Sequence, residues 1–403
     1  MTRRLFWENP YLLETESKVE RLEAKDGNFY IILDRTIFYP DMSGGQPGDE
    51  GTINGIKVQR TFEDGDDLVH ILYQKPSPGK VKLKIDGERR LDFMQQHSGQ
   101  HLLSGVLFRL FGVETIGFHL GDEYTTIDLD TSNLSEDELV RAELLSNKII
   151  QSNFRIKSYM VSSDEAKLLP VRKSPSVEKN IRVVEIDGFD FSPCGGTHVG
   201  ATGELGILKI IKTENYKGKI RLYFLSGQRS VDDYLNKFNS IKEISSAMST
   251  SDSQVVERFL SIYSERNSLS KEVRELKESL LSIEGENLIR DARPHGEHRI
   301  IYKVFSSMDF KELSYMGGWL TNTYDSLVLL FGIEGSSISQ FMVSKSKNVE
   351  LELNDIYKEL SSSRQIKGGG NSNTIQGSVA SNQLQVLLED CLGLVMEALD
   401  QKK

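Results

Sequence analysis

A heptad pattern in the second half of the chain constrains its fold more than any other feature. Apolar residues from Val255 to Ile283 alternate spacings of three and four, and Arg266 holds the one seam position that is not apolar. A seam of about four repeats with charged flanks predicts a helical segment, which Gly285 and the segment around Pro294 are expected to end. The seam leaves open both a helical hairpin and a dimerising coiled coil, so a homodimer is a possible assembly.

The sequence on either side of this seam divides by its patterning. Short runs of β-branched and large apolar residues between turn signals predict a small barrel at the N-terminus. Helix and strand patterns then mix, and Asp92 is expected to cap the first long helix. The expected fold class is α+β, with an N-terminal β-barrel (1–88), an α/β core (89–230), a helical or coiled-coil connector (231–290) and a C-terminal α/β domain (291–403).

The bulk composition excludes several classes of protein. A hydrophobic content of 38% and a charged content of 27% are typical of a soluble globular protein. There is no run of 18 apolar residues, so no membrane span is expected, and no apolar stretch follows Arg3 and Arg4 as it would in a signal peptide. Two cysteines, Cys194 and Cys391, exclude a disulfide framework and favour the reducing cytoplasm.

The charge distribution bears on nucleic-acid binding. A net charge of -10 counts against a protein that coats nucleic acid by charge alone. One local stretch is basic, and an ordinary solvated strand face explains it about as well as contact with a phosphate backbone. The basic residues of this stretch are Lys209, Lys212, Lys217, Lys219, Arg221 and Arg229.

Two short motifs carry the chemistry. His97 and His101 are four residues apart in a helical segment, which places two imidazoles about 40° apart and ~6 Å along the axis. Cys194 and His198 flank Gly195-Gly196-Thr197, where two glycines allow a tight loop. The four side chains form a tetrahedral set of the type that zinc accepts, with one Zn²⁺ per chain. The spacing does not decide between a closed structural zinc and a catalytic zinc with an exchangeable position.

These motifs, about 95 residues apart, resemble the editing domain of alanyl-tRNA synthetase. They are still more similar to the free-standing alanyl-tRNA editing proteins, which tend to have glutamine at the position of Gln100. The block Phe38–Asp49 is similar to the glycine-rich loop of that family's barrel, and Thr202–Gly206 also fits. The resemblance covers roughly residues 1 to 230. The connector and the C-terminal domain, with a glycine-rich loop at Gly368–Gly370, more weakly resemble the synthetase C-terminal domain.

The resemblance implies a zinc-dependent hydrolase that removes serine or glycine from mischarged tRNA(Ala), acting in trans without ATP. Residues 89–230 would then be the zinc-dependent editing domain. Gln100 and His119 are the candidate catalytic residues beside the metal ligands. The candidate contacts to substrate or tRNA are Gly44, Gly45, Gln46, Thr197, Lys209, Lys212, Arg221, Gly368, Gly369 and Gly370.

Two other functions remain open from the sequence. One is a zinc hydrolase that acts on another aminoacyl-tRNA or on a small aminoacyl ester. The other is a non-catalytic tRNA-binding protein with a structural zinc, in which loss of the metal would unfold the middle domain. The basic stretch and the C-terminal domain suit both functions that involve tRNA.

Overall fold

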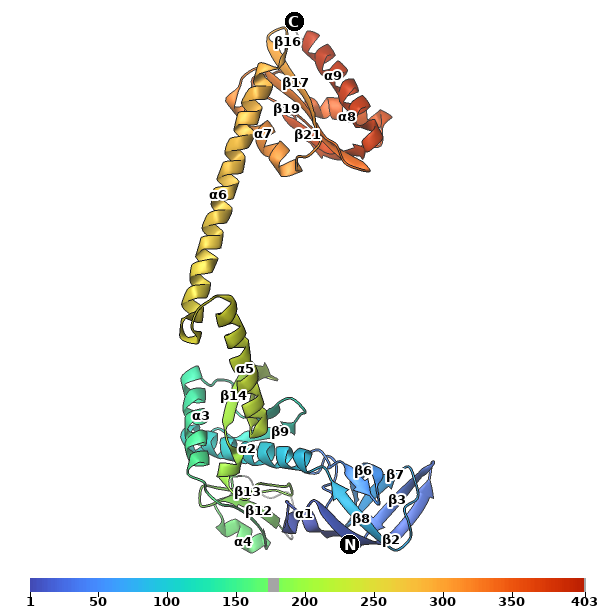
Figure 1. The fold of residues 1–403 in the computed structure, drawn as a ribbon, viewed down its shortest axis with the longest axis vertical. Coiled ribbons are helices and arrows are strands. Elements are labelled where there is room, and N and C mark those ends of the chain that lie inside the picture. The colour runs from blue at the N-terminus through green and yellow to red at the C-terminus, as the bar shows by residue number, and fades with distance from the viewer. Residues whose placement is uncertain (173–180, 402–403) are drawn as a thin grey trace. The chain divides into compact units, whose positions relative to one another are not determined.

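The structure, a computed structural model, describes residues 1–172 and 181–401, which form two compact units, Met1–Ile244 and Ser245–Lys403 (Figure 1). Helices and sheets occur in both units, as expected for a mixed α+β protein. The boundary between the units falls within helix α5 (Gln228–Ala247). The finer division into four domains stays a prediction. No described helix combines the length and the hydropathy that a membrane crossing requires.

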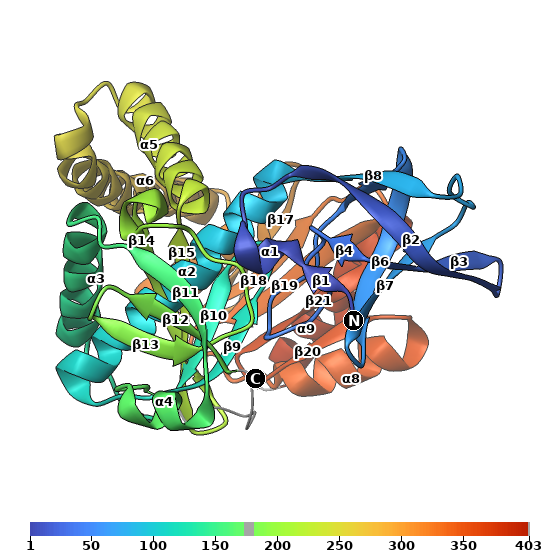
Figure 2. The same ribbon diagram turned by 90° about the horizontal axis from the view of Figure 1, so that it is seen from below.

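The N-terminal part of the first unit is a closed six-stranded barrel with the strand order β2-β3-β7-β6-β5-β8 (Figure 2). Strand β8, Lys-Val-Lys-Leu-Lys-Ile, alternates exposed lysines with buried apolar residues, which is the pattern of a strand with one face on a core. A short helix, α1 (Leu5–Glu8), precedes the barrel, and β1 (Arg3–Arg4) pairs with β4 (Arg35–Thr36). The barrel strands are β2 (Glu14–Lys25), β3 (Asn28–Leu33), β5 (Gly51–Ile53), β6 (Ile56–Asp64), β7 (Asp67–Leu72) and β8 (Lys80–Ile85).

Helix α2 (Gly87–Phe111) is the central element of the first unit. Every residue from Gln96 to Leu107 is buried, so the helix is covered on all sides and not along a single stripe. Two sheets lie around it, in the orders β14-β15-β10-β9 and β11-β12-β13. The remaining elements of this core are β9 (Thr115–Leu120), β10 (Thr125–Leu129), α3 (Glu136–Gln151), β11 (Ile156–Val161), α4 (Ser163–Leu168), β12 (Ile181–Ile186), β13 (Asp190–Pro193), β14 (Leu208–Tyr216) and β15 (Lys219–Ser226).

The start of α2 corrects the prediction that Asp92 caps it. The cap is Asp86, whose side chain accepts hydrogen bonds from the backbone N–H groups of Glu88 and Arg89 at 3.0 and 3.1 Å. Asp92 lies inside the helix and forms an ion pair with Arg229, 2.6 Å from its guanidinium. The sequence pattern was misleading because either aspartate can begin a helix. The arginine that pairs with Asp92 lies far along the chain, so the local sequence does not reveal it.

The second unit is built on a six-stranded sheet with the order β16-β17-β18-β19-β21-β20. Every residue of the central strand β18 is buried, because α7 and the end of α6 pack on one face and α8 and α9 on the other. The elements are α6 (Val255–Arg290), β16 (Arg293–His295), β17 (His298–Phe305), α7 (Phe310–Thr323), β18 (Leu327–Ile333), β19 (Ile338–Lys345), α8 (Leu353–Ser363), β20 (Lys367–Gly370), β21 (Thr374–Ala380) and α9 (Leu384–Asp400).

The heptad seam lies on one helix, α6, and Gly285 does not end it. Helix α6 continues through this residue to Arg290, and Gly285 is buried. A Cβ atom there would lie 3.1 Å from Trp319 and 3.3 Å from Leu320 on α7. The glycine therefore permits close helix packing and does not terminate the helix.

The triglycine segment is also not the loop that was expected. Gly368, Gly369 and Gly370 belong to edge strand β20, which pairs with β21 in a hairpin. A Cβ atom on Gly368 would overlap the carbonyl oxygen of Gln376 on the neighbouring strand. Close approach of two backbones explains this glycine without any ligand.

Candidate metal centre and its pocket

The four predicted ligands come together in the first unit. His97 and His101 extend from α2, and Cys194 and His198 follow β13 in a loop. One ligand atom from each of these residues lies within 4.8 Å of the others. The Cys194 Sγ atom is 3.3 Å from His97 Nε2 and 3.4 Å from His198 Nε2. Two motifs that are far apart in sequence therefore form one cluster, as their residue types predicted.

The cluster fits a zinc ion by its donor set. One sulfur and three imidazole nitrogens, with no carboxylate in the cluster, are the ligands that a tetrahedral zinc site uses. His101 adds a second indication. Both of its ring nitrogens are buried, and neither has a hydrogen-bond partner among the described residues. Buried polar atoms are nearly always paired, so this ring points to a partner such as a metal ion.

The protonation states suit metal binding. Burial lowers the pKa of His101 to about 3 and holds the pKa values of His97 and His198 well below their ordinary value. All three imidazoles are therefore neutral near pH 7, which is the form that binds a metal. Burial raises the pKa of the Cys194 thiol, so this group would release its proton when a metal binds.

The loop between Cys194 and His198 is held by donors from distant segments. Trp7 Nε1 on α1 donates to the carbonyl oxygen of Gly195 at 2.7 Å. The Arg182 guanidinium on β12 donates to the carbonyl oxygens of Cys194 and Gly196, each at 2.9 Å. Three consecutive carbonyls thus have partners, which fixes the path of the loop and the direction of the Cys194 side chain.

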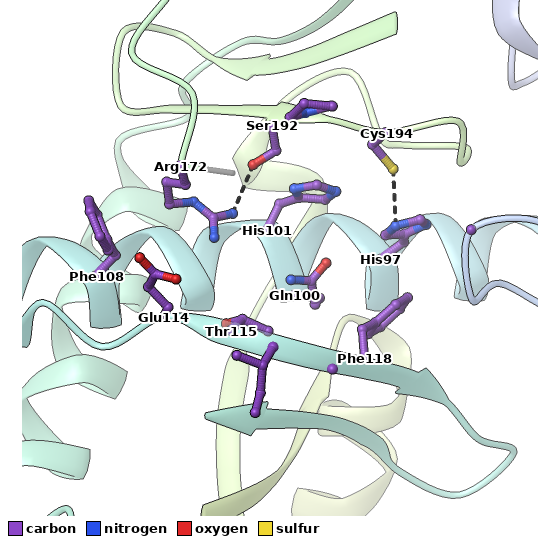
Figure 3. Close-up of a pocket in the computed structure, with 14 residues that line it drawn as sticks. His97, Gln100, His101, Phe108, Glu114, Thr115, Phe118, Arg172, Ser192 and Cys194 are labelled. Atoms are coloured by element: carbon purple, nitrogen blue, oxygen red, sulfur yellow. Dashed lines mark hydrogen bonds between the residues drawn. The ribbon is translucent and has the colours of Figure 1, made fainter. Parts of the chain in front are cut away.

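A pocket of about 300 Å³ opens beside the ligands (Figure 3). Gln100 lies in its wall and donates from Nε2 to Ser104 Oγ at 2.9 Å, and Thr115 donates to the same oxygen at 2.7 Å. Phe118 forms another wall and stacks on the His97 ring, with the ring centroids 5.0 Å apart. A small cavity with an aromatic wall and a few convergent polar groups has the character of a binding site for a small moiety.

The structure separates the two predicted catalytic residues. Gln100 is buried in the wall of the pocket. His119 is exposed and does not line the pocket, because its neighbour Phe118 on β9 takes the inward position. Successive side chains on a strand point to opposite faces, so only one of the two can face the metal.

The predicted contacts to tRNA are also divided. Gly44 lines the pocket, and Gly45 packs against Phe118. Gln46 and Thr197 are fully buried and hydrogen-bonded to each other, so neither is exposed to a tRNA end. Both side chains are buried outside the pocket lining, contrary to the expectation that they touch substrate.

The basic residues are paired within the unit. Lys209 lies 2.8 Å from Glu143, Lys212 lies 2.5 Å from Glu214, and Arg221 binds both carboxylate oxygens of Asp128 at 2.6 and 2.8 Å. A phosphate would have to compete with these carboxylates. Their role in tRNA binding stays a prediction.

Sequence reasoning missed a charged group beside His101. Arg172 forms an ion pair with Asp190 and donates to Ser192 Oγ at 2.9 Å. Asp190 Oδ2 lies 3.9 Å from His101 Nδ1. A signal was present, because Asp190 and Ser192 precede Cys194 by four and two residues and so share its strand face.

One cysteine and three histidines form a cluster that could hold a metal ion, and this cluster lies beside a small pocket in a mixed α+β unit. Residues 181–223 match the family described as the threonyl and alanyl tRNA synthetase second additional domain. Several known proteins are similar to this chain over most of its length.

The alanyl-tRNA editing protein AlaX-L of Pyrococcus horikoshii is 30% identical over 397 residues, which are 96% of this chain and 96% of that protein. The alanyl-tRNA editing protein Aarsd1 of Danio rerio is 29% identical and covers 92% of this chain and 88% of its own length. The alanine–tRNA ligase of Ignicoccus hospitalis is 34% identical over 70% of this chain and 32% of that ligase. The chain belongs to the family of alanyl-tRNA editing proteins.

Proposed function

We propose that the protein is a trans-editing deacylase, which hydrolyses the ester between tRNA(Ala) and a wrongly attached serine or glycine. The observation that carries this proposal is the small pocket beside the ligand cluster, lined by Gln100 and Phe118. The match to the P. horikoshii editing protein over nearly the full length of both chains supports it.

The need for such an enzyme follows from binding energetics. A pocket built for alanine cannot strongly reject glycine, which lacks one methyl group, since a methylene contributes only ~1–3 kcal/mol of discrimination. Serine adds only a hydroxyl and is also hard to exclude. A second, hydrolytic site must then accept serine or glycine and spare alanine.

The polar wall of the pocket offers a way to make this choice. Gln100 and Thr115 line the pocket and are joined through the Ser104 hydroxyl in a hydrogen-bond chain that could re-form around a serine hydroxyl. A serine hydroxyl could add a hydrogen bond to this chain, a gain that neither alanine nor glycine can supply, so this wall favours serine. We assign Gln100 to substrate contact on this basis.

We propose that His97, His101, Cys194 and His198 hold one zinc ion. A bound zinc would polarise the ester carbonyl or lower the pKa of a water to ~7. The chain's own residues have separate tasks: Phe118 closes one side of the site, and Gly44 lines it without a side chain. Asp190, held by Arg172, places a negative charge 3.9 Å from His101 Nδ1.

For the remaining tRNA contacts, we propose Gly44 and Gly45 near the acceptor end. Lys209, Lys212 and Arg221 would contact the phosphate backbone of the tRNA. In the C-terminal domain, the tRNA would contact Gly368, Gly369 and Gly370. We also propose that the protein functions in the cytoplasm, because free cysteines at 194 and 391 suit a reducing compartment.

We further propose a homodimer through α6. This helix exposes an apolar stripe that includes Phe259 (51% exposed), Leu269 (52%) and Leu280 (65%), at positions of the heptad seam. Burying such a stripe against a second copy would be favourable. Sedimentation equilibrium that shows only monomer at micromolar concentration would reject this assembly.

The function is tested by deacylation of Ser-tRNA(Ala), Gly-tRNA(Ala) and Ala-tRNA(Ala). We expect loss of serine or glycine with alanine spared, and at least a ~1,000-fold slower rate in His101→Ala, because several kcal/mol of metal stabilisation are removed. His119→Ala is the matched histidine variant, and its exposed position predicts a rate within about threefold of wild type.

Two results would contradict the proposal. A zinc-loaded, folded protein that hydrolyses none of the three would leave a tRNA-binding protein with a structural zinc. Full activity on short aminoacyl esters without tRNA would favour the hydrolase of another ester.

A further inference from the structure

Gln46 is a buried barrel residue that reaches the metal centre. It belongs to the loop between β4 and β5, and its side chain is fully buried. Its Oε1 atom lies 2.9 Å from His97 Nδ1 and 3.2 Å from the backbone nitrogen of Thr197, and its Nε2 atom donates to Thr197 Oγ1 at 2.8 Å. One amide therefore joins the barrel to both halves of the ligand cluster.

The partners of this amide determine which way it faces. A backbone N–H can only donate, so the amide atom beside the Thr197 nitrogen must be the oxygen. The same oxygen faces His97 Nδ1, which must then carry the hydrogen. The Nε2 atom of His97 is left with its lone pair, and Nε2 is the atom that lies 3.3 Å from Cys194 Sγ.

We propose that Gln46 is a positioning residue for His97, which sets the tautomer and the ring direction of this zinc ligand. Histidine ligands usually donate their second N–H to an oxygen, and that partner tunes metal affinity. The inference rests on the proposed zinc site and adds that the barrel completes it. It replaces the expected role of Gln46 in contact with tRNA.

The loop that carries Gln46 is itself anchored to α2. Asp49 forms a buried ion pair with Arg90, whose Nε donates to Oδ1 at 2.9 Å. The second carboxylate oxygen of Asp49 accepts the backbone N–H of Tyr39 at 2.6 Å. Arg90 also donates to the carbonyl oxygen of Ile37 at 2.6 Å. With both ends of the loop tied to the helix that bears His97, the amide is held in place.

The other two imidazoles face groups of the core and not of the barrel. His198 Nδ1 lies 3.2 Å from Ser98 Oγ on α2. His101 Nδ1 faces Asp190 on β13 at 3.9 Å. Gln46 therefore makes the barrel's contribution to the imidazole ligands, and His97 is the ligand that should respond to its loss.

Zinc affinity of two Gln46 variants, measured by competition with a chromophoric chelator, tests the role. Gln46→Met keeps the length but has no oxygen acceptor, and we expect zinc to bind about 10–100-fold more weakly. Gln46→Glu keeps an acceptor for His97 and for Thr197, so its affinity should stay within about threefold of wild type. Gln59→Met, the same change at an exposed barrel glutamine, is the control.

A second measurement does not depend on any variant folding. Nitrogen-15 NMR of zinc-loaded wild type should find hydrogen on Nδ1 of His97 and none on Nε2. Hydrogen on Nε2, or a folded Gln46→Met that binds zinc as tightly as wild type, would overturn the positioning role. Wild type is measured first: if it binds no zinc at all, the proposed zinc site fails together with this inference, whereas tight wild-type binding isolates the test of Gln46.

Discussion

The two halves of the ligand cluster are held in different ways. His97 and His101 lie one turn apart on α2, so the helix backbone alone sets their spacing. Cys194 and His198 lie in an irregular loop, whose consecutive carbonyls are bound by Trp7 and Arg182 from other elements. The helix half is local in sequence, and the loop half depends on contacts between distant segments.

This difference teaches where the site is vulnerable. A helix keeps its ligand spacing as long as the helix forms, and α2 is buried along most of its length. A loop has no such repeating hydrogen bonds, so each carbonyl that loses its donor becomes an unpaired buried group. Substitutions outside the four ligands should therefore disturb the loop half more than the helix half.

The largest effect is expected from Arg182→Met. It leaves the carbonyls of Cys194 and Gly196 without their charged donor, and each such bond contributes ~1.5–3 kcal/mol. We expect the first unit to lose about 3–5 kcal/mol of stability and the zinc content to fall. Urea denaturation followed by Trp7 fluorescence, in a Trp319→Phe background that leaves one tryptophan, measures the stability, and atomic emission measures the zinc.

Arg109→Met is the matched control for this prediction. Arg109 also donates to two consecutive carbonyls, those of Gly188 and Phe189, but it is exposed and binds a turn outside the ligand loop. Its loss should cost about 1 kcal/mol or less and leave zinc binding intact. Equal zinc loss in the two variants would show that the loop half has no special dependence on Arg182.

The same difference explains what the sequence could predict. Residue types and spacing were sufficient to predict that these four side chains cluster, because His97 and His101 obey a helical period and Cys194 and His198 share one short motif. Alternation in β8 and the seam of α6 were equally visible, since both are local periodicities. These features need no knowledge of what packs against them.

Long-range partners were not visible in the same way. Gln46 sits in a glycine-rich block that suggested contact with tRNA, but its amide is buried against His97 and Thr197. The sequence around Asp92 is typical of a helix cap, but its carboxylate forms an ion pair with Arg229. In each case the local pattern gave a polar side chain one role, contact with tRNA or a helix cap, and a residue far along the chain binds it instead.

An intermediate effect on zinc affinity is expected when one methyl group is added beside each half of the ligand cluster. In the loop half, a Cβ atom on Gly196 would overlap the His97 ring. In the helix half, a Cβ atom on Gly99 would lie 2.7 Å from Ser226 Oγ on β15. Overpacking costs ~1–3 kcal/mol in either place. We expect Gly196→Ala to weaken zinc binding at least about tenfold and Gly99→Ala to leave it within about threefold. Competition with a chelator measures the zinc affinity of both variants. A larger loss of affinity in Gly99→Ala than in Gly196→Ala would refute the proposal that the loop half is the more sensitive one.

The smallest effect concerns the barrel that carries Gln46 and depends on pH. His70 is fully buried, with Nε2 2.9 Å from Thr36 Oγ1 and Nδ1 3.3 Å from the carbonyl oxygen of Ile31. Burial lowers the pKa of His70 to about 4, from an ordinary value of 6.5. Between these two values the unfolded chain binds a proton that the folded chain does not, so stability falls as the pH falls. From pH 7.5 to 5.5 this group should remove about 1 kcal/mol from the first unit.

His70→Gln isolates this contribution, because every other titrating group is common to the two proteins. The variant should be less stable than wild type at pH 7.5, since a fitted buried ring is lost, and the gap should narrow by about 1 kcal/mol at pH 5.5. The Trp7 fluorescence assay at both pH values measures the gap. A gap that stays constant would mean that His70 titrates alike in the folded and unfolded chains, and it would exclude this residue as a source of acid sensitivity in the first unit.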